Sequence, residues 1–228
     1  MHALPRSPSR HTAADDVFER LHADIVGLKL VPGTKLSEVE VARQFDVSRQ
    51  PVREAFIRLA NLDLLQVRPQ RATEVRRFSE SALRNGRFIR MAIEIEVLRR
   101  ACTRPAHAFD KRFEANLRQQ EKAIRAGKVE RFHDLDHEFH ELICLAADCE
   151  FAYVTVAATK SQMSRLCMLS LADSDELLET HEDHRGLHEC IREGREASAV
   201  TLMRHHLSRI DKVLESVRES HAEYFDAH

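Results

Sequence analysis

Fourteen histidines occur in this 228-residue chain, which has no tryptophan and two tyrosines. Neutral imidazole is a frequent ligand of divalent metal ions, so histidines that converge in the fold could share one ion. Asp136 and His140 form the first candidate pair, because side chains four residues apart lie on one face of a helix, one turn from each other. Both would lie at one edge of the apolar stripe that contains Phe139 and Leu142.

The other candidate ligands lie toward the C-terminus. In a helix predicted over 175–193, three histidines fall within the apolar stripe, and periodicity alone leaves all of them open: His181, His184 and His188. In a last helix predicted over 196–225, His206 lies at the margin of the stripe and His205 points nearly the opposite way. One inward histidine is more often a hydrogen-bonded core residue than a ligand, so a metal site requires several to converge.

The remaining histidines receive simpler predictions. His137 is expected to face solvent, and His133 lies between the inward and outward positions of its helix. We therefore keep His133, His181 and His188 as candidates for the core or for groups that support the ligands.

A second group of polar side chains lies near the N-terminus. Ser48 can cap a helix whose opposite face carries three long polar side chains: Arg49, Gln50 and Arg53. Arginine can donate two hydrogen bonds at once to guanine or to a phosphate. The chain then alternates with period two over 64–68 and 73–76, which predicts a hairpin with Arg71 in a basic tip.

The composition excludes several classes of protein. Gly and Pro number six each, too few for a turn-rich β-sandwich. Five cysteines without a CxxC pair predict neither a disulfide framework nor a zinc ribbon, and they indicate a reduced cytoplasm. No apolar run approaches the roughly 20 residues of a membrane span. Residues 1–12 lack the apolar segment of a secretory signal and are predicted to be a disordered tail.

The predicted elements divide into two domains. Residues 13–78 contain three helices followed by the hairpin, which is the order of a winged helix-turn-helix. Ser37 and Glu40 form an S-x-x-E capping box at the start of the second helix. Residues 79–228 are expected to form an all-helical bundle of about six helices, over about 80–103, 106–126, 129–147, 150–172, 175–193 and 196–225. The expected fold class is mainly α.

The N-terminal motifs resemble a known family. PGTKLSE at 32–38 and VSRQPVREA at 47–55 are similar to the DNA-binding domain of the GntR superfamily of bacterial transcription regulators. The resemblance implies that four residues contact DNA or lie against it: Ser48, Arg49, Gln50 and Arg53. The family usually has glycine at the positions of Asp63 and Ala72, so the turn after the recognition helix and the reach of the wing are where this chain departs from the pattern.

The C-terminal motifs resemble the FCD ligand-binding domain, which defines the FadR-like branch of that superfamily. DHEFH at 136–140 is similar to its D-x-x-F-H element, and EDH at 182–184 and MRHHL at 203–207 are similar to its E-x-H and M-x-x-H-L elements. The resemblance implies the metal ligands Asp136, His140, His184 and His206. Three imidazoles and one carboxylate suit Zn²⁺, Ni²⁺ or Mn²⁺. The resemblance also implies that Arg90 and Arg165 lie near the effector pocket, where each could bind a carboxylate. The alternative for each arginine is a structural ion pair.

These observations predict a metal-containing, homodimeric, DNA-binding transcriptional regulator, more specifically a repressor, that binds a pseudo-palindromic operator and responds to a small organic acid. The acid would bind at the metal and shift the population between two arrangements of the recognition helices. One alternative is a metal-dependent hydrolase that uses the Asp/His site. It lacks a clearly placed general base and leaves the first domain unexplained, so no enzymatic activity is expected. A helical scaffold with a structural metal is the other alternative.

Overall fold

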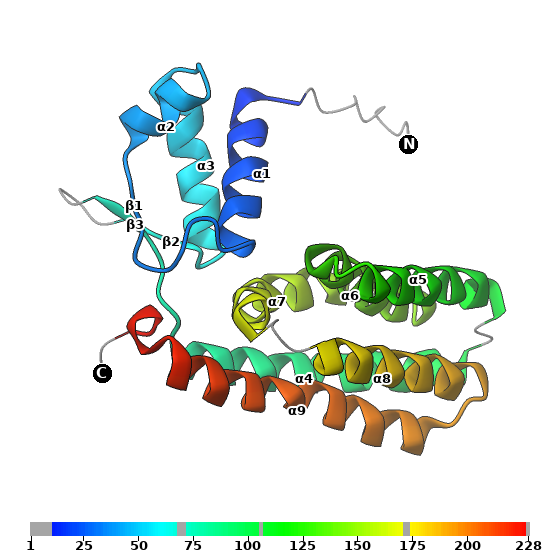
Figure 1. The fold of residues 1–228 in the computed structure, drawn as a ribbon. Helices are drawn as coiled ribbons and strands as arrows, with labels where there is room; N and C mark the ends of the chain where they lie inside the picture. The colour runs from blue at the N-terminus through cyan, green and yellow to red at the C-terminus, as the bar shows by residue number, and fades with distance from the viewer. Residues whose placement is uncertain (1–10, 68–71, 105–106, 171–173, 227–228) are drawn as a thin grey trace, which may run out of the picture. The chain divides into compact units, whose positions relative to one another are not determined.

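The computed structural model of the protein describes residues 11–67, 72–104, 107–170 and 174–226 (Figure 1). It contains two compact units, and the sequence passes from one to the other between Arg76 and Arg77, close to the boundary predicted after residue 78. Most of the predicted disordered tail lies outside the described residues. No helix within the described ranges is long and apolar enough to cross a membrane. The five cysteines are free thiols.

The first unit contains three helices at the positions that periodicity predicts: α1 (Ala13–Val26), α2 (Glu38–Gln44) and α3 (Arg49–Asn61). Apolar stripes of α1 and α3 form its core, with Val17, Leu21, Ile25, Val52, Ala55, Phe56 and Leu59 buried. Arg58 of α3 connects the two helices, because its guanidinium lies 3.9 Å from the ring centroid of Phe18 and donates to Asp15 at 2.8 Å. Together, α2 and α3 form a helix-turn-helix.

The helix caps differ from the predicted ones. Ser37 and Ser48 are the N-cap residues of α2 and α3 and have extended backbones, but neither side chain makes a capping hydrogen bond. The backbone provides the first bond of α2 instead, since the Ser37 carbonyl accepts the Val41 amide at 3.0 Å. The predicted capping box with Glu40 is therefore wrong: Glu40 is exposed.

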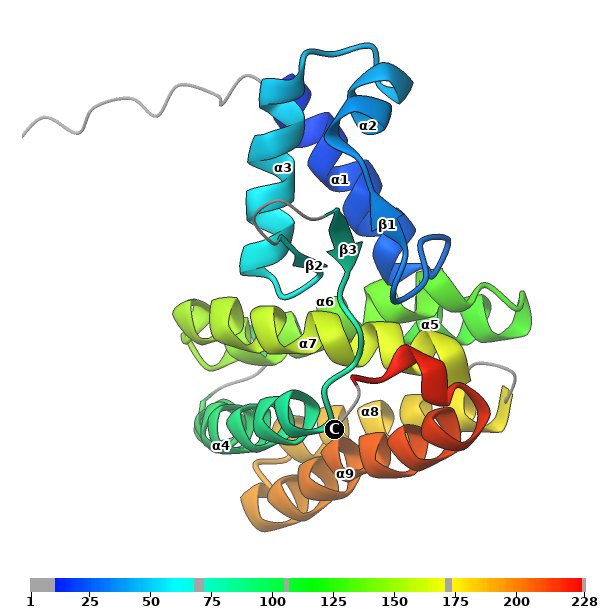
Figure 2. The same cartoon turned by 90° about the vertical axis from the view of Figure 1, so that its left-hand side faces the viewer.

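A small antiparallel sheet completes this unit. Its strands β1 (Lys35–Leu36), β2 (Leu65–Gln66) and β3 (Thr73–Val75) have the order β1-β3-β2 (Figure 2). Leu65 pairs with Val75, so β2 and β3 form the predicted hairpin. The sequence did not predict β1, because two residues carry no periodicity. Asp63 has φ +57°, so an aspartate here adopts the left-handed backbone that favours glycine. Ala72, just before β3, is exposed.

The second unit is a helical bundle. Its described helices are α4 (Glu80–Thr103), α5 (His107–Arg125), α6 (Val129–Ala146), α7 (Glu150–Ser170), α8 (Ser174–Arg192) and α9 (Glu196–Ser220). They start within one residue of the predicted positions, and α4 and α9 run side by side in Figure 1. The last helix ends before the predicted residue 225, because a short 3₁₀ helix over Ala222–Tyr224 follows it and Phe225 forms a parallel bridge with Phe78.

The core of the bundle is largely apolar. Leu98, Phe113, Phe139, Leu187 and Met203 belong to one large buried cluster. Ionisable side chains from α6, α8 and α9 are buried beside it: Asp136, His140, His184 and His206. Burying such groups is costly unless they are paired or bind a metal, so their partners indicate what this part of the bundle does.

Candidate functional site

The N-terminal turn of α3 presents the predicted DNA-binding side chains to solvent. Ser48, Arg49, Gln50 and Arg53 are all exposed, and the Gln50 amide donates to the Glu54 carboxylate at 3.2 Å. In a winged helix-turn-helix, the N-terminal end of the second helix of the motif, here α3, contacts base edges in the major groove. The predicted wing-tip residue, Arg71, lies outside the described residues.

One carboxylate holds both arginines of this face. Glu38 Oε2 accepts a hydrogen bond from Arg49 Nη2 at 2.8 Å and another from Arg53 Nε at 2.9 Å. The hydrogen bond from Arg49 is the main cause that lowers the pKa of Glu38. Exposed ion pairs contribute only about 0.2–1 kcal/mol to stability. The contact therefore matters chiefly because it orients the two guanidinium groups.

The bundle brings the four predicted metal ligands together. Asp136 and His140 come from α6, His184 from α8 and His206 from α9, and one potential ligand atom from each lies within 4.8 Å of the others. His206 Nε2 is 3.2 Å from His140 Nε2, and Asp136 Oδ1 is 3.3 Å from His184 Nε2. Ligand atoms about 2.1 Å from one ion, at angles of 90° to 109°, are about 3.0–3.4 Å apart. These separations therefore suit a shared ion.

A polar side chain lies beside the outer nitrogen of each imidazole. His184 Nδ1 is hydrogen-bonded to Gln120 Oε1 at 2.9 Å, and the carboxylates of Glu94 and Asp183 lie at ion-pair distance from His140 Nδ1 and His206 Nδ1. Metal-binding histidines commonly donate the other ring N–H to such an acceptor, which fixes the tautomer and directs a lone pair at the ion. The donor set therefore suits a divalent metal.

Burial and charge set the protonation states of the cluster. Burial lowers the pKa of His184 to about 3 and also lowers that of His206, so both imidazoles are neutral near pH 7. Burial alone would raise the pKa of Asp136, but the Lys160 ammonium, with Nζ 2.5 Å from Asp136 Oδ2, holds it well below its usual value. His184 and His206 are thus neutral imidazoles beside a carboxylate anion, the forms that bind metals.

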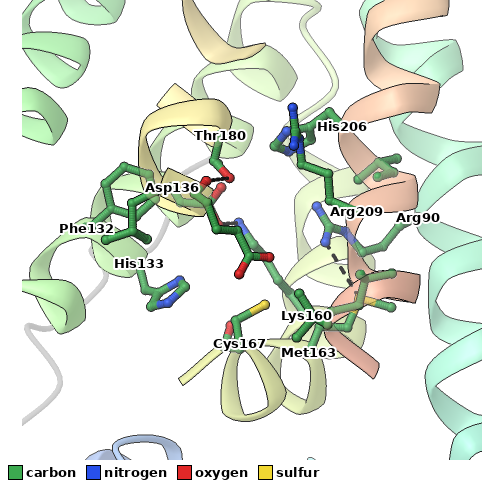
Figure 3. Close-up of a pocket in the computed structure, with 16 residues that line it drawn as sticks. Arg90, Phe132, His133, Asp136, Lys160, Met163, Cys167, Thr180, His206 and Arg209 are labelled. Atoms are coloured by element: carbon green, nitrogen blue, oxygen red, sulfur yellow. Dashed lines mark hydrogen bonds and ion pairs between the residues drawn. The ribbon is translucent and has the colours of Figure 1, made fainter. Parts of the chain in front are cut away.

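A cavity of about 90 Å³, partly open to solvent, adjoins this cluster and is lined in part by Asp136 and His206 (Figure 3). Three cationic side chains line it: Arg90, Lys160 and Arg209. Its other walls are largely apolar and include Phe132, Met163, Leu177, Leu207 and Ile210. Glu176 also lines the cavity, but the three cations beside the Asp/His cluster favour an anionic ligand.

The two arginines expected near the effector have different positions in the structure. Arg90 lines the cavity, donates from Nε to Glu94 Oε1 at 2.6 Å and has Nη2 3.5 Å from His140 Nε2. Arg165 is fully buried but is not among the residues that line the cavity; its guanidinium lies 4.9 Å from the ring centroid of Phe78. A contact of Arg165 with an effector stays a prediction.

Among the other histidines, one prediction is wrong. His137 is half-buried rather than solvent-facing, with Nε2 2.9 Å from Ser164 Oγ, because α7 packs against this side of α6. His205 is exposed, as predicted. His181 Nδ1 lies 3.3 Å from Gln120 Oε1, and His188 Nε2 lies 3.3 Å from Asp110 Oδ1. Neither belongs to the metal-binding cluster.

The winged helix-turn-helix and the helical bundle with this cluster together define a ligand-binding transcription regulator. Residues 13–75 match the gntR family of bacterial regulatory proteins, and residues 87–209 match the FCD domain. The chain belongs to the GntR family of DNA-binding transcriptional regulators, in the branch that carries an FCD domain. Its relatives are transcription regulators rather than enzymes, and nothing supports the hydrolase alternative.

Two relatives and one solved structure illustrate the similarity. The HTH-type transcriptional repressor RspR of Escherichia coli is 38% identical over 213 residues, which cover 92% of each chain. A probable D-xylose utilization operon transcriptional repressor of Paenarthrobacter nicotinovorans is 28% identical over 91% of each chain. The structure of E. coli McbR/YncC has the same fold, with a TM-score of 0.76 and 19% identity over 90% of this chain and 98% of that one.

The sequence did not predict several residues that contribute to these sites. Glu38 reaches Arg49 and Arg53 only through the packing of α2 on α3, for which periodicity gives no signal. Gln120 is one polar residue among many on α5. Lys160 does carry a signal, since it is the only charged residue between Glu150 and Arg165 in a long predicted helix. An isolated lysine in such a helix indicates either a buried ion pair or a ligand contact.

Proposed function

We propose that this protein is a metal-containing, carboxylate-responsive repressor that binds a pseudo-palindromic operator as a homodimer. The observation that carries the proposal is the arrangement of His140, His184 and His206. Their Nε2 atoms converge with Asp136 Oδ1, while a polar side chain lies beside each outer nitrogen. This arrangement has the features of a metal site with three imidazoles and one carboxylate.

The metal would be a divalent ion such as Zn²⁺, Ni²⁺ or Mn²⁺. Asp136, His140, His184 and His206 would hold it, and the ion would supply a positive charge that attracts an effector carboxylate. The side of the cluster that faces the cavity is formed by Asp136 and His206. Arg90 and Lys160 lie on the same cavity and would neutralise the remaining carboxylate charge.

The DNA contacts would be made by the exposed turn of α3. Arg49 and Arg53 are held close together by Glu38, so binding would lose less side-chain entropy than two independent arginines would. Ser48 and Gln50 would contact the backbone or base edges, with Arg71 of the wing on phosphates. Two relatives are named as repressors, which supports repression as the direction of control.

The homodimer would form on the outer face of α4 and α7, which pack against each other. Phe88 of α4 is 75% exposed, and Phe151 and Val154 of α7 are 75% and 72% exposed. Exposed large apolar side chains can mark interaction surfaces. A second copy is the occupant that we infer, because two recognition helices are needed to bind the two halves of a pseudo-palindrome.

The conformational effect of effector binding would be transmitted to the DNA-binding unit through the covalent connection between the units. Arg90 belongs to α4, and residues 76–79 alone connect the start of α4 to the end of β3 in the wing. The effector would act as a population shift, favouring the arrangement of the dimer for which it has the higher affinity.

The test combines operator selection with metal and effector titration. Duplexes selected from a random library by the purified protein should share a pseudo-palindrome. Affinity for the selected duplex should change on addition of a carboxylate in the metal-loaded protein and remain unchanged in the chelator-treated protein. Selection without any palindromic enrichment would contradict the dimeric repressor, and an equal response without metal would contradict the metal-bridged effector.

A further inference from the structure

Two buried amide side chains of α5 form a hydrogen-bonded chain that ends at the proposed metal site. Asn116 is 3% exposed and Gln120 is fully buried. Asn116 Nδ2 donates to the Leu135 carbonyl of α6 at 3.0 Å, and Gln120 Nε2 donates to Asn116 Oδ1 at 2.6 Å. At the far end, Gln120 Oε1 lies 2.9 Å from His184 Nδ1. This amide chain therefore connects the backbone of α6 to an imidazole of α8.

Each hydrogen bond of the amide chain fixes the direction of the next. A backbone carbonyl can only accept, so the NH₂ group of Asn116 must face Leu135, and a carboxylate oxygen of Glu138 lies 3.4 Å from the same nitrogen. Asn116 Oδ1 is then the atom that faces Gln120, and it can pair only with the Gln120 NH₂ group. The Gln120 oxygen is thereby turned toward His184.

The direction of the Gln120 amide decides the tautomer of His184. An amide oxygen only accepts, so His184 must donate from Nδ1, and its Nε2 then carries the lone pair. Nε2 is the atom that lies 3.3 Å from Asp136 Oδ1. A reversed amide would present its NH₂ group to His184 and favour the opposite tautomer, in which a proton on Nε2 blocks metal binding.

The other two imidazoles of the cluster need no such arrangement. Glu94 and Asp183, which lie beside His140 Nδ1 and His206 Nδ1, are carboxylates, and both oxygens of a carboxylate accept. An amide has an acceptor at one end and a donor at the other, with nearly the same shape, so packing alone does not set the direction of Gln120. A hydrogen bond from a further residue is needed to set it.

We propose that Asn116 and Gln120 are positioning residues of the metal site, which hold His184 in the tautomer whose Nε2 can bind the ion. Gln120 acts directly on the imidazole, and Asn116 acts at one remove, through Gln120. The proposal rests on the metal-containing function above and adds to it two residues outside the ligand set.

The test measures the zinc affinity of the full-length protein by competition with a chelator of known affinity. Gln120→Leu should lose about 10–100-fold, the usual effect of removing such a partner. Asn116→Leu should lose about tenfold, because the zinc-bound form must then keep the Gln120 NH₂ group buried without its acceptor. Asn116→Asp keeps an oxygen that faces Gln120 and should recover most of that affinity.

The aspartate variant separates positioning from a general loss of stability. A buried aspartate beside the Leu135 carbonyl is more costly than a leucine, so Asn116→Asp should have the lower metal-free Tm of the two Asn116 variants. If the role of Asn116 were only structural, the less stable variant would also bind zinc more weakly. Gln119→Leu makes the same change as Gln120→Leu at an exposed neighbour in α5 and should leave zinc affinity unchanged.

Nitrogen NMR of the metal-free protein provides a second measurement that does not depend on the Asn116 variants. In the wild type, His184 should carry its proton on Nδ1, and in Gln120→Leu part of this proton should move to Nε2. A proton on Nε2 in the wild type, wild-type zinc affinity in both leucine variants of the amide chain, or weaker zinc binding by Asn116→Asp than by Asn116→Leu would overturn the positioning proposal and leave the metal site intact. Failure of the wild type to bind zinc would overturn the proposed metal site as well.

Discussion

Replacing His184 gives the sharpest test of the metal site, because the same helix supplies a matched control. His184 is fully buried, has its inward Nε2 3.3 Å from Asp136 Oδ1 and is hydrogen-bonded to Gln120 through Nδ1 at 2.9 Å. His181 lies one turn earlier, is 8% exposed and contacts the same Gln120 oxygen at 3.3 Å. The two alanine variants therefore remove similar imidazoles with similar hydrogen bonds, but only one of them removes a proposed ligand.

The size of the effect follows from linkage between binding and folding. An ion present at about 100 times its dissociation constant stabilises the folded state by about 2.7 kcal/mol. For chains of about 150–250 residues, 1 kcal/mol corresponds to about 2–4 °C in Tm. Metal should therefore raise the Tm of the wild-type protein by about 5–11 °C. The His181→Ala variant should show the same increase, and the His184→Ala variant should show little or none.

The assay is differential scanning calorimetry of each protein after chelation and again after addition of zinc, with elemental analysis of the same samples. His184→Ala also loses the stacking of its ring on Phe139, whose centroid is 4.1 Å away. Its metal-free Tm will therefore be lower, so the comparison uses only the increase that metal causes. A full complement of zinc and a wild-type increase in His184→Ala, or loss of both in His181→Ala, would refute the assigned ligands.

Three other outcomes are expected. Arg49→Ala and Arg53→Ala should each weaken specific operator binding by about 1–3 kcal/mol in a gel-shift titration, and wild-type affinity in both would exclude α3 as the recognition helix. Burial lowers the pKa of His22, His133 and His181, so the unfolded chain binds more protons below about pH 6.5. The stability that these neutral rings contribute is present above pH 6.5 and is lost as pH falls, so the metal-free Tm should decrease between pH 7 and 5; a constant Tm would contradict their burial. Phe151→Glu should yield a monomer in sedimentation velocity with weaker operator binding, and a dimer of wild-type affinity would place the interface elsewhere.

Helix positions were predictable because each bundle helix has an apolar stripe and ends near a break. The stripe also showed that Asp136, His140 and His206 face inward. It could not distinguish His184 from His181 and His188, because all three are buried. Only the positions of α5 and α6 around α8 decide which imidazole meets Asp136 and which meets Gln120 or Asp110.

Errors occurred where a local pattern did not decide the contact that forms. His137 lies on the polar side of its own helix, but α7 covers it. The capping box at Ser37 fits a local pattern, yet the Ser37 side chain makes no cap bond and Glu40 remains in solvent. For His137 the local pattern was overridden by a contact with another helix, and at Ser37 the backbone alone provides the first bond of the helix.

The sequence by itself determined the family, the two-domain order, the inward faces of the helices and the set of metal-binding candidates. These depend on residue type and spacing within single elements. Tertiary structure alone decided that Glu38 joins Arg49 and Arg53 and that Lys160 neutralises Asp136. The physical reason is that pairing and burial depend on the distances between elements, and helical periodicity specifies only the direction of a side chain about its own axis.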